Sequence, residues 1–189
     1  MIILAVDTET TGLKPEKGDR IIEVCLGLYE VDDTGVVTEI ETVTQRINPL
    51  RAIPIEAQRV HGISLEDLRT MPTWSDFAEQ AEKIISRADL VVIHNAEFDA
   101  PFIETEQRNA GRPLATPLRT FCTMENARWA TFDGKRPTLA ELCWSLGIAF
   151  DTSAAHSADY DTKKMMECFG KGLRLGLYKL EKGENDEEV

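Results

Sequence analysis

The sequence lacks every segment that would place the chain in or across a membrane. No apolar run approaches the ~20 residues that a bilayer crossing requires. The N-terminus has no basic region or cleavage site, and its apolar stretch, MIILAV, is too short for a signal sequence. We therefore expect a soluble, cytoplasmic protein.

Cysteine is scarce, and its spacing excludes the common cysteine frameworks. The four cysteines, Cys25, Cys122, Cys143 and Cys168, form no C-x-x-C pair and have mostly apolar neighbours. This distribution predicts buried thiols in a reducing compartment rather than disulfides or a zinc site.

Nothing in the composition divides the 189-residue chain into several domains. It has no Pro- or Gly-rich linker and no repeat of fixed period, while 42% hydrophobic and 29% charged residues are typical of a globular protein. We predict one domain over residues 1–180. Residues 181–189, with five acids and one lysine, are predicted to form a disordered acidic tail.

Positive charge is in short supply, since the formal net charge is −12. That balance argues against bulk, non-specific binding of nucleic acid. Residues 107–138 reverse it locally, with six Lys or Arg against Glu125 and Asp133. Solvated helix faces account for this segment as well as phosphate contacts do. An enzyme that grips only a chain end needs few phosphate contacts, so acidity does not exclude a nucleic-acid substrate.

The pattern of apolar residues predicts an α/β fold. Strands are expected at 2–7, 20–31, 36–47, 89–94 and 119–123. Helices are expected at 54–62, 64–70, 75–88, 96–111, 124–130, 138–147 and from about Ser157 onward. Three hairpin-linked strands followed by strand–helix–strand units predict a mixed five-stranded sheet with helices on both faces and the first strand central. The three tryptophans, Trp74, Trp129 and Trp144, are expected to pack between helices.

Acidic residues follow the first strand in the segment VDTETTG. Asp7 and Glu9 are two positions apart, so in a strand both side chains point to the same side. Two such charges repel each other unless water or a cation compensates them. The segment is therefore either a solvated strand end or half of a metal site.

Two further acidic clusters occur later in the chain. In HNAEFDAPF, Asp99 falls in the first turn of a predicted helix, where Asn95 as N-cap and the helix dipole alone would favour an acid. In AHSADYDTKK, His156 precedes Asp161 by five residues, which is ~140° apart on one helix. The two converge only if His156 lies on the loop before the helix.

In order and context, DTETTGL, HNAEFD and HSADYD resemble the three motifs of the DEDDh (DnaQ-like) 3′-to-5′ exonuclease family. That family includes the epsilon subunits of DNA polymerase III, ribonuclease T and oligoribonuclease. The resemblance covers roughly residues 2–171 and implies a ribonuclease-H-like fold.

The resemblance also implies a mechanism. Asp7, Glu9, Asp99 and Asp161 would be the ligands of two Mg²⁺ or Mn²⁺ ions, which suit all-oxygen donors. Four carboxylates would balance two divalent cations, and His156 would be the general base for the attacking water.

Substrate contacts are expected on the basis of the same resemblance. The segment PIEAQRVHGI matches a region that touches the terminal nucleotide in epsilon-type enzymes, although it also reads as a short packed helix. Phe98 is either a core residue, the interpretation we favour, or a surface on which a base stacks. The candidates are Thr10, Leu13, Glu56, Val60, His61 and Phe98. His94 and Asn95 are expected to hold the turn between strand and helix.

We therefore expect a metal-dependent enzyme that removes mononucleotides from the 3′ ends of single-stranded or frayed DNA. An RNA-trimming enzyme of the ribonuclease T kind is the alternative, since 2′-hydroxyl contacts are not readable from sequence. Leu13 stands where ribonuclease T has an aromatic residue. A catalytically inactive nucleic-acid-binding module would have no need of the full set of carboxylates and the histidine. A polymerase partner is conceivable for an epsilon-like domain, but the short acidic tail gives it no support.

Overall fold

The first three strands form an antiparallel meander, which is the order that their short connections favour. The computed structural model describes residues 1–180; the predicted acidic tail lies outside the described residues. Strands β1 (Ile2–Thr10), β2 (Ile21–Val31) and β3 (Val37–Arg46) pair in sequence order. The turn between β2 and β3 is built on Asp32, whose carboxylate accepts from the backbone N–H groups of Thr34 and Val36.

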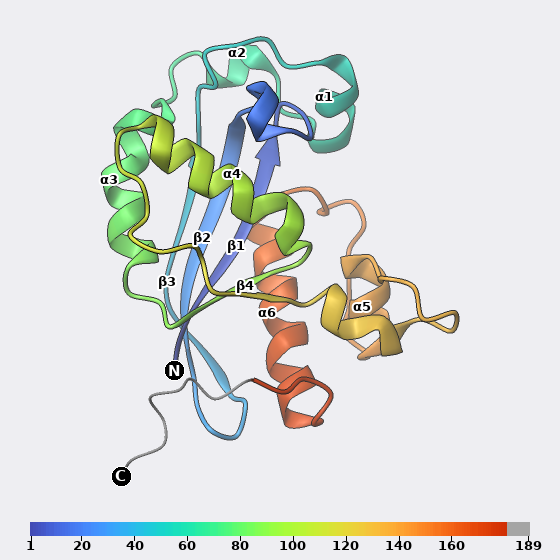
Figure 1. Cartoon of the computed structure of the whole chain (residues 1–189). Helices are drawn as coiled ribbons and strands as arrows, with labels where there is room; N and C mark the ends of the chain where they lie inside the picture. Colours follow the sequence, from blue (N-terminus) through green and yellow to red (C-terminus); the bar gives the residue numbers. More distant parts are fainter. Residues whose placement is uncertain (181–189) are drawn as a thin grey trace.

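Two shorter strands extend this meander on the other side of β1. Strand β4 (Leu90–Ile93) pairs with β1 in parallel, and β5 (Thr120–Cys122) pairs with β4 in parallel. The sheet order is β3-β2-β1-β4-β5, and Figure 1 labels the first four of these strands. The predicted mixed five-stranded sheet with a central first strand is therefore confirmed.

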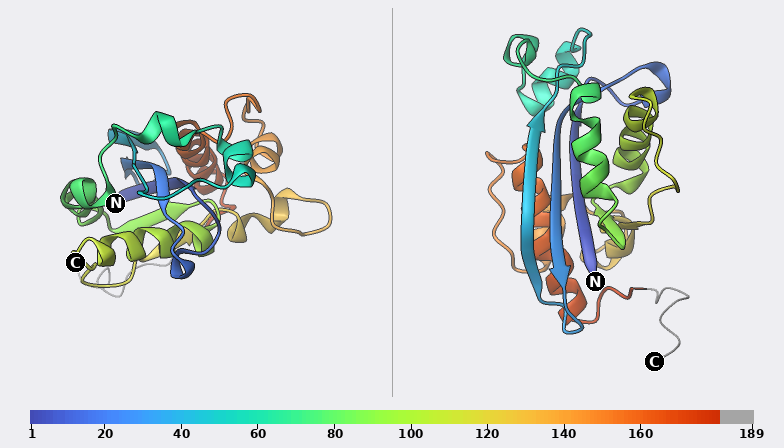
Figure 2. Two further views of the ribbon diagram at one scale, coloured as in Figure 1. Left: turned by 90° about the horizontal axis from the view of Figure 1, so that it is seen from above. Right: turned by 90° about the vertical axis from the view of Figure 1, so that its left-hand side faces the viewer.

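Helices cover both faces of the sheet. The helices are α1 (Ile55–His61), α2 (Leu65–Leu68), α3 (Trp74–Ile85), α4 (Ala96–Asn109), α5 (Leu139–Ser145) and α6 (Ala158–Arg174), with 3₁₀ turns at Pro15–Lys17 and Glu125–Ala130. In the right-hand view of Figure 2, α6 lies on one side of the strands, and α3 and α4 lie on the other. No helix within residues 1–180 combines the length and the apolar character that a membrane crossing needs.

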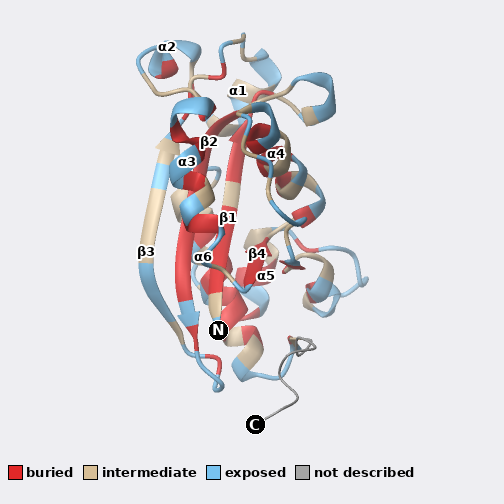
Figure 3. Cartoon of the chain, turned by 60° about the vertical axis from the view of Figure 1, so that its left-hand side comes forward, coloured by how far each residue is buried: buried red, intermediate tan, exposed pale blue. Residues whose placement is uncertain are grey.

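The period-two alternation of β1 assigns its side chains to two separate cores. Leu4 and Val6 belong to the core under α3 and α4, whereas Ile3 and Ala5 belong to the core under α6. Figure 3 shows β1 and β2 buried along most of their length, while β3 lies at the partly exposed edge of the sheet. A strand covered on both faces has no solvated side for an acid, so polar residues on β1 require a special environment.

Two expectations about local structure need correction. Residues 124–130 were expected to form a helix but form a 3₁₀ turn that is interrupted at Ala127. Trp129 and Trp144 were expected to pack between helices, yet they are 39% and 57% exposed, and only Trp74 is fully buried. Trp74 is held by a hydrogen bond from its indole N–H to Gln107, whereas Trp144 lies on the outer face of the short helix α5.

The cysteines are mostly buried, as their apolar neighbours indicate, and two of them lie in contact with each other. All four cysteines are free, and three of them are buried, while Cys122 is intermediate. Although 25 residues separate them in the sequence, the Sγ atoms of Cys143 and Cys168 lie 3.4 Å apart between α5 and α6. Spacing in the sequence does not reveal this contact.

A buried ion pair fixes α4 against the start of β2. Arg20 donates two hydrogen bonds of 2.7 Å to Glu106 on α4, and the N–H of Ile21 donates a third to the same carboxylate. The Glu106 side chain is 2% exposed and that of Arg20 is 29% exposed. The carboxylate holds the pKa of Arg20 above its usual value through the hydrogen bond.

Removing only one partner of this pair should destabilise the fold. Glu106→Ala leaves Arg20 without its buried counter-charge, and we expect a loss of about 2–3 kcal/mol in the free energy of unfolding, reduced from the fully buried case because Arg20 reaches solvent. Urea unfolding measures it. The double variant Arg20→Met/Glu106→Leu should recover part of the loss; equal stability of Glu106→Ala and wild type would contradict the argument.

Candidate active site

The end of β1 directs two carboxylates toward the face that α6 covers. Asp7 and Glu9 continue the side of β1 that carries Ile3 and Ala5, so the structure confirms that they point the same way. Glu9 is 8% exposed. Thr8, between them, points to the opposite face, where α4 lies.

Helix α4 brings a third carboxylate to the same strand end. Asn95 has a left-handed φ of 84°, which asparagine tolerates better than most residues, and this lets the chain turn from β4 directly into α4. Asp99 then lies in the first turn and is 3% exposed. Its Oδ1 accepts from the backbone N–H of Thr8 at 3.0 Å and from the Thr8 hydroxyl at 2.6 Å. These two bonds fasten α4 to the middle of the carboxylate pair on β1.

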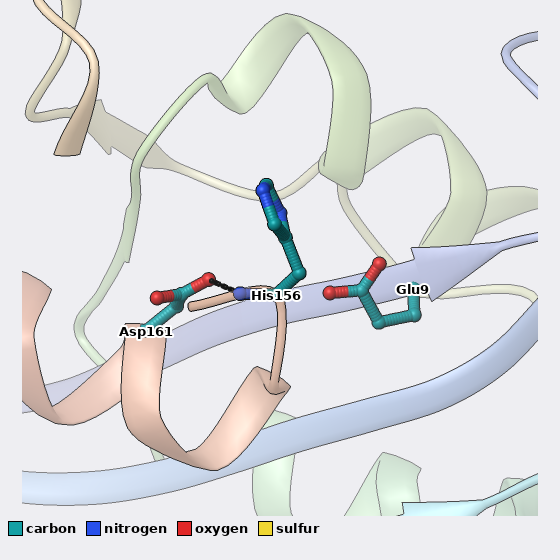
Figure 4. A group of neighbouring side chains, drawn as sticks. All are labelled: Glu9, His156 and Asp161. Carbon is teal, nitrogen blue, oxygen red and sulfur yellow. Dashed lines mark hydrogen bonds between the residues drawn. The ribbon is translucent and has the colours of Figure 1, made fainter. Parts of the chain in front are cut away.

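Helix α6 brings the fourth carboxylate together with the histidine. His156 lies on the loop just before α6, and Asp161 lies in the first turn of the helix, as the sequence requires if the two are to converge. His156 has a left-handed φ of 63°, a conformation that costs a non-glycine residue of order 1 kcal/mol or more. Its backbone N–H donates to Asp161 Oδ2 at 3.0 Å, which holds the strained turn (Figure 4).

Three of these side chains already form a cluster suited to a cation. One ligand atom from each of Glu9, His156 and Asp161 lies within 4.8 Å of the others. In Figure 4 the carboxylates of Glu9 and Asp161 lie on either side of the His156 backbone, with its ring between and above them. Asp161 Oδ1 is buried without a hydrogen-bond partner in the described chain, so it is available to a positive ion.

Burial raises the pKa of every carboxylate in this group, and repulsion by neighbouring acids adds to the effect for Asp7 and Glu9. Burial, then the charges of neighbouring acids, raises the pKa of Glu9 to about 8 and that of Asp7 well above its usual value. Burial raises the pKa of Asp99 to about 7 against the opposing hydrogen bonds from Thr8, and it also raises the pKa of Asp161. Without a cation, the four groups cannot all be ionised near neutral pH at low cost.

A cavity of about 420 Å³ opens beside this cluster. Its lining includes all five residues of the three motifs and five of the six expected substrate contacts, namely Thr10, Leu13, Val60, His61 and Phe98. The sixth, Glu56, is exposed on α1 and is not part of the lining. Ala57 lines the cavity instead, from the helix face that it shares with Val60 and His61. Helical phase could have identified Ala57 from the sequence.

The cavity has an apolar rim and polar groups deeper inside. Leu13 and Val60 are 76% and 57% exposed, an unusual state for large apolar side chains. Phe98 packs against Phe102 with ring centroids 5.1 Å apart, as the favoured core interpretation expects, and the residue also lines the cavity.

Two histidines besides His156 line the cavity. His61 Nδ1 accepts from the N–H of Ile63 at 3.0 Å, so the neutral ring carries its proton on Nε2, which has no partner in the described chain. His94 Nδ1 lies 2.9 Å from the Thr123 hydroxyl, and burial lowers the pKa of His94 to about 4. His94 and Asn95 hold the turn, as expected, but they also border the cavity.

Comparisons with known proteins agree with this geometry. The model of the exonuclease family named for ribonuclease T matches residues 4–169. Ribonuclease T of Vibrio vulnificus is 28% identical over 199 residues, covering 97% of this chain and 91% of that protein. The epsilon subunit of DNA polymerase III from Rickettsia conorii is 34% identical over 182 residues, covering 94% of this chain and 76% of that protein.

Solved structures share the fold. Exonuclease I of E. coli, in a zinc-bound complex with single-stranded DNA, superposes with a TM-score of 0.76 at 17% identity, over 90% of this chain and 40% of that one. This chain thus spans about two fifths of exonuclease I. Exonuclease X, in complex with 5′-overhanging duplex DNA, superposes with a TM-score of 0.61 at 22% identity, over 89% of this chain and 90% of that one. The ribonuclease-H-like fold is confirmed.

The family match spans most of the chain, and one relative above 30% identity is covered over three quarters of its length. The chain therefore belongs to this DnaQ-like exonuclease family, and its activity is that of a 3′-to-5′ exonuclease, a phosphodiester hydrolase.

Proposed function

We propose that the enzyme removes mononucleotides from the 3′ ends of single-stranded or frayed DNA by two-metal-ion hydrolysis. One observation carries the proposal: four carboxylates and a histidine, from β1, α4 and α6, meet at one cavity with an apolar rim. Its size is in the range of small-ligand sites, which suits one terminal nucleotide rather than a duplex.

The residues present fit a pair of hard divalent cations. Asp7, Glu9, Asp99 and Asp161 offer only oxygen donors, and Asp161 Oδ1 is buried and unpartnered. Such all-oxygen ligands suit Mg²⁺ or Mn²⁺ better than they suit zinc. Bound there, the two ions would activate water and stabilise charge on the departing 3′ oxygen.

His156 is proposed as the general base. It lies on an exposed loop and lines the cavity beside the carboxylates, where it offers imidazole nitrogens rather than carboxylate oxygens. A neutral imidazole can take a proton from water near pH 7. The backbone bond from His156 to Asp161 keeps the ring at the cluster while leaving both ring nitrogens unrestrained by that contact.

The terminal nucleotide is proposed to bind against the rim of the cavity. Leu13 and Val60 would cover the base from the outside, and the free face of Phe98 would contact it from α4. The unpartnered Nε2–H of His61 would donate to a phosphate or sugar oxygen. Every side chain in the proposed chemistry comes from this chain, and a polymerase partner is not part of the proposal.

RNA trimming is the second candidate. Similarity over nearly the full length of ribonuclease T supports it. The higher identity to the epsilon subunit, and neighbours of known structure that hold DNA, lead us to put DNA first.

End-labelled substrates test the activity, its direction and the preferred sugar together. With 5′-labelled single strands of DNA or RNA and Mg²⁺ or Mn²⁺, we expect a ladder of products shortened from the 3′ end, with DNA degraded faster. A 3′-phosphate should inhibit, because the cavity receives a free terminal nucleotide, and EDTA should abolish the reaction. Cleavage of circular single-stranded DNA at a comparable rate would contradict an exonuclease.

The carboxylate cluster should make the metal-free protein less stable as pH rises. The pKa of Glu9 is higher in the folded than in the unfolded state, so its stabilising effect is present below about pH 4.5 and is lost as pH rises through about 8. Unfolding measured in EDTA from pH 5 to pH 8 should therefore show a steeper loss in wild type than in Glu9→Gln.

Millimolar Mn²⁺ should reverse that loss in wild type, because binding to the folded state alone stabilises it by mass action, by about 2.7 kcal/mol at a hundredfold excess over Kd. Glu9→Gln should gain less. Identical pH slopes in the two proteins, together with no response to Mn²⁺, would rule out the proposed site.

His156→Ala separates the base from the metal ligands. We expect it to keep its fold and its stabilisation by Mn²⁺ but to lose turnover by ~10²–10⁴-fold. Asp161→Asn should instead lose both turnover and much of the stabilisation. Turnover of His156→Ala within a few-fold of wild type would refute the role of the base.

A further inference from the structure

Another carboxylate, buried on β2, lies beside the cluster but is not part of the cavity lining. Glu23 on β2 is directly opposite Glu9 in the antiparallel ladder, so the two side chains share the face that α6 covers. Glu23 is 5% exposed, and its charge contributes to the raised pKa of Glu9. A buried like charge at this position adds to the repulsion in the cluster, and neither the proposed metal ligands nor the base requires it.

Both oxygens of Glu23 are already engaged. Oε2 accepts from Nε of Arg46 on β3 at 3.0 Å, and the Arg46 side chain is about half exposed. Oε1 accepts from the backbone N–H of Ala158 at 3.3 Å, across 135 residues of sequence. With both oxygens occupied, Glu23 is not arranged as an additional metal ligand.

Ala158 is the first residue of α6, where backbone N–H groups have no partner inside the helix. Three helices of the described chain, α2, α3 and α5, satisfy such groups with a capping box formed by their own residues. The N-cap of α6, Ser157, makes no side-chain hydrogen bond. Glu23 supplies the missing acceptor from another element, and its negative charge also suits the positive end of the helix dipole.

We propose that Glu23, held by Arg46, is a positioning residue that caps α6 from the sheet and thereby fixes His156 and Asp161 relative to Glu9. Ala158 lies two residues after His156 and three before Asp161, so this bond holds the chain where the base loop enters the helix. Two hydrogen bonds then hold the strained turn at His156. The N–H of His156 donates to Asp161, and the N–H of Ala158, the first residue of α6, donates to Glu23. The role assigned here rests on the proposed exonuclease mechanism.

Two substitutions at Glu23 separate capping from charge and from metal binding. Glu23→Gln keeps an amide oxygen that can accept from Ala158, whereas Glu23→Ala removes the acceptor. We expect Glu23→Ala to lower kcat by about 10- to 100-fold with little change in KM, because small displacements of reacting groups are costly in rate. Glu23→Gln should recover kcat to within a few-fold of wild type. Mn²⁺ should stabilise both variants as it does wild type.

Glu41→Ala is the matched control. Glu41 on β3 is also a sheet carboxylate in an ion pair, here with Arg87, but its side chain is 41% exposed and it caps no helix of the described chain. We expect its kcat to equal that of wild type. Hydrogen–deuterium exchange of the peptide covering residues 153–165 gives a readout without substrate: exchange in the first turn of α6 should rise roughly tenfold in Glu23→Ala and stay near wild type in Glu23→Gln and Glu41→Ala.

Two outcomes would overturn the assignment of Glu23, and a third would overturn the proposed function alone. If Glu23→Gln is as slow as Glu23→Ala and also loses stabilisation by Mn²⁺, Glu23 binds metal and is not a cap. If Glu23→Ala keeps both its kcat and its slow exchange, the contact with Ala158 positions nothing. If wild type degrades neither DNA nor RNA, the proposed function fails, and the exchange measurement still decides whether Glu23 caps α6.

Discussion

Repulsion among buried carboxylates at the end of β1 is the constraint on which the arrangement of the molecule depends. A central strand covered on both faces ordinarily carries apolar side chains, and β1 does so until Val6. Beyond that point, four acids with raised pKa values are collected around one strand end. Such a group is stable in the ionised form only if cations compensate it, so the fold holds together a set of charges that the folded chain alone does not balance.

The surrounding structure counteracts this repulsion with fixed contacts on each face of the sheet. On the α4 face, two hydrogen bonds from Thr8 hold Asp99, while the ion pair of Arg20 with Glu106 holds the far part of the same helix. On the α6 face, the backbone of His156 holds Asp161. The carboxylates are thus placed by backbone and helix geometry rather than by one another. Their positions can persist while their ionisation changes with pH or with bound metal.

The parts of this design that depend on local pattern were predictable from the sequence. The apolar run before Asp7, the period-two spacing of Asp7 and Glu9, and the loop position of His156 follow from strand and helix geometry within a few residues. Glu23 was not recognised, because its burial depends on register with Glu9 and on the arrival of a helix 135 residues later. The exposure of Trp144 was missed for a related reason: α5 is only seven residues long, and whether its outer face is covered depends on distant chain.

Charge also determines the order of events in the proposed reaction. With a formal net charge of −12, the protein offers little general attraction to a polyanionic strand, and without cations every ionised carboxylate of the cluster would repel the phosphate of the terminal nucleotide. The locally basic segment 107–138 offers little relief, since Arg136 is paired with Glu97 and Glu125, and Lys135 with Glu141. Two divalent cations would change the four carboxylates from a net repulsive to a neutral site, and the phosphate of the terminal nucleotide could then approach. In the proposed mechanism, metal binding would therefore precede productive substrate binding, and recognition would depend on the apolar rim and the free chain end rather than on a basic surface that tracks the strand.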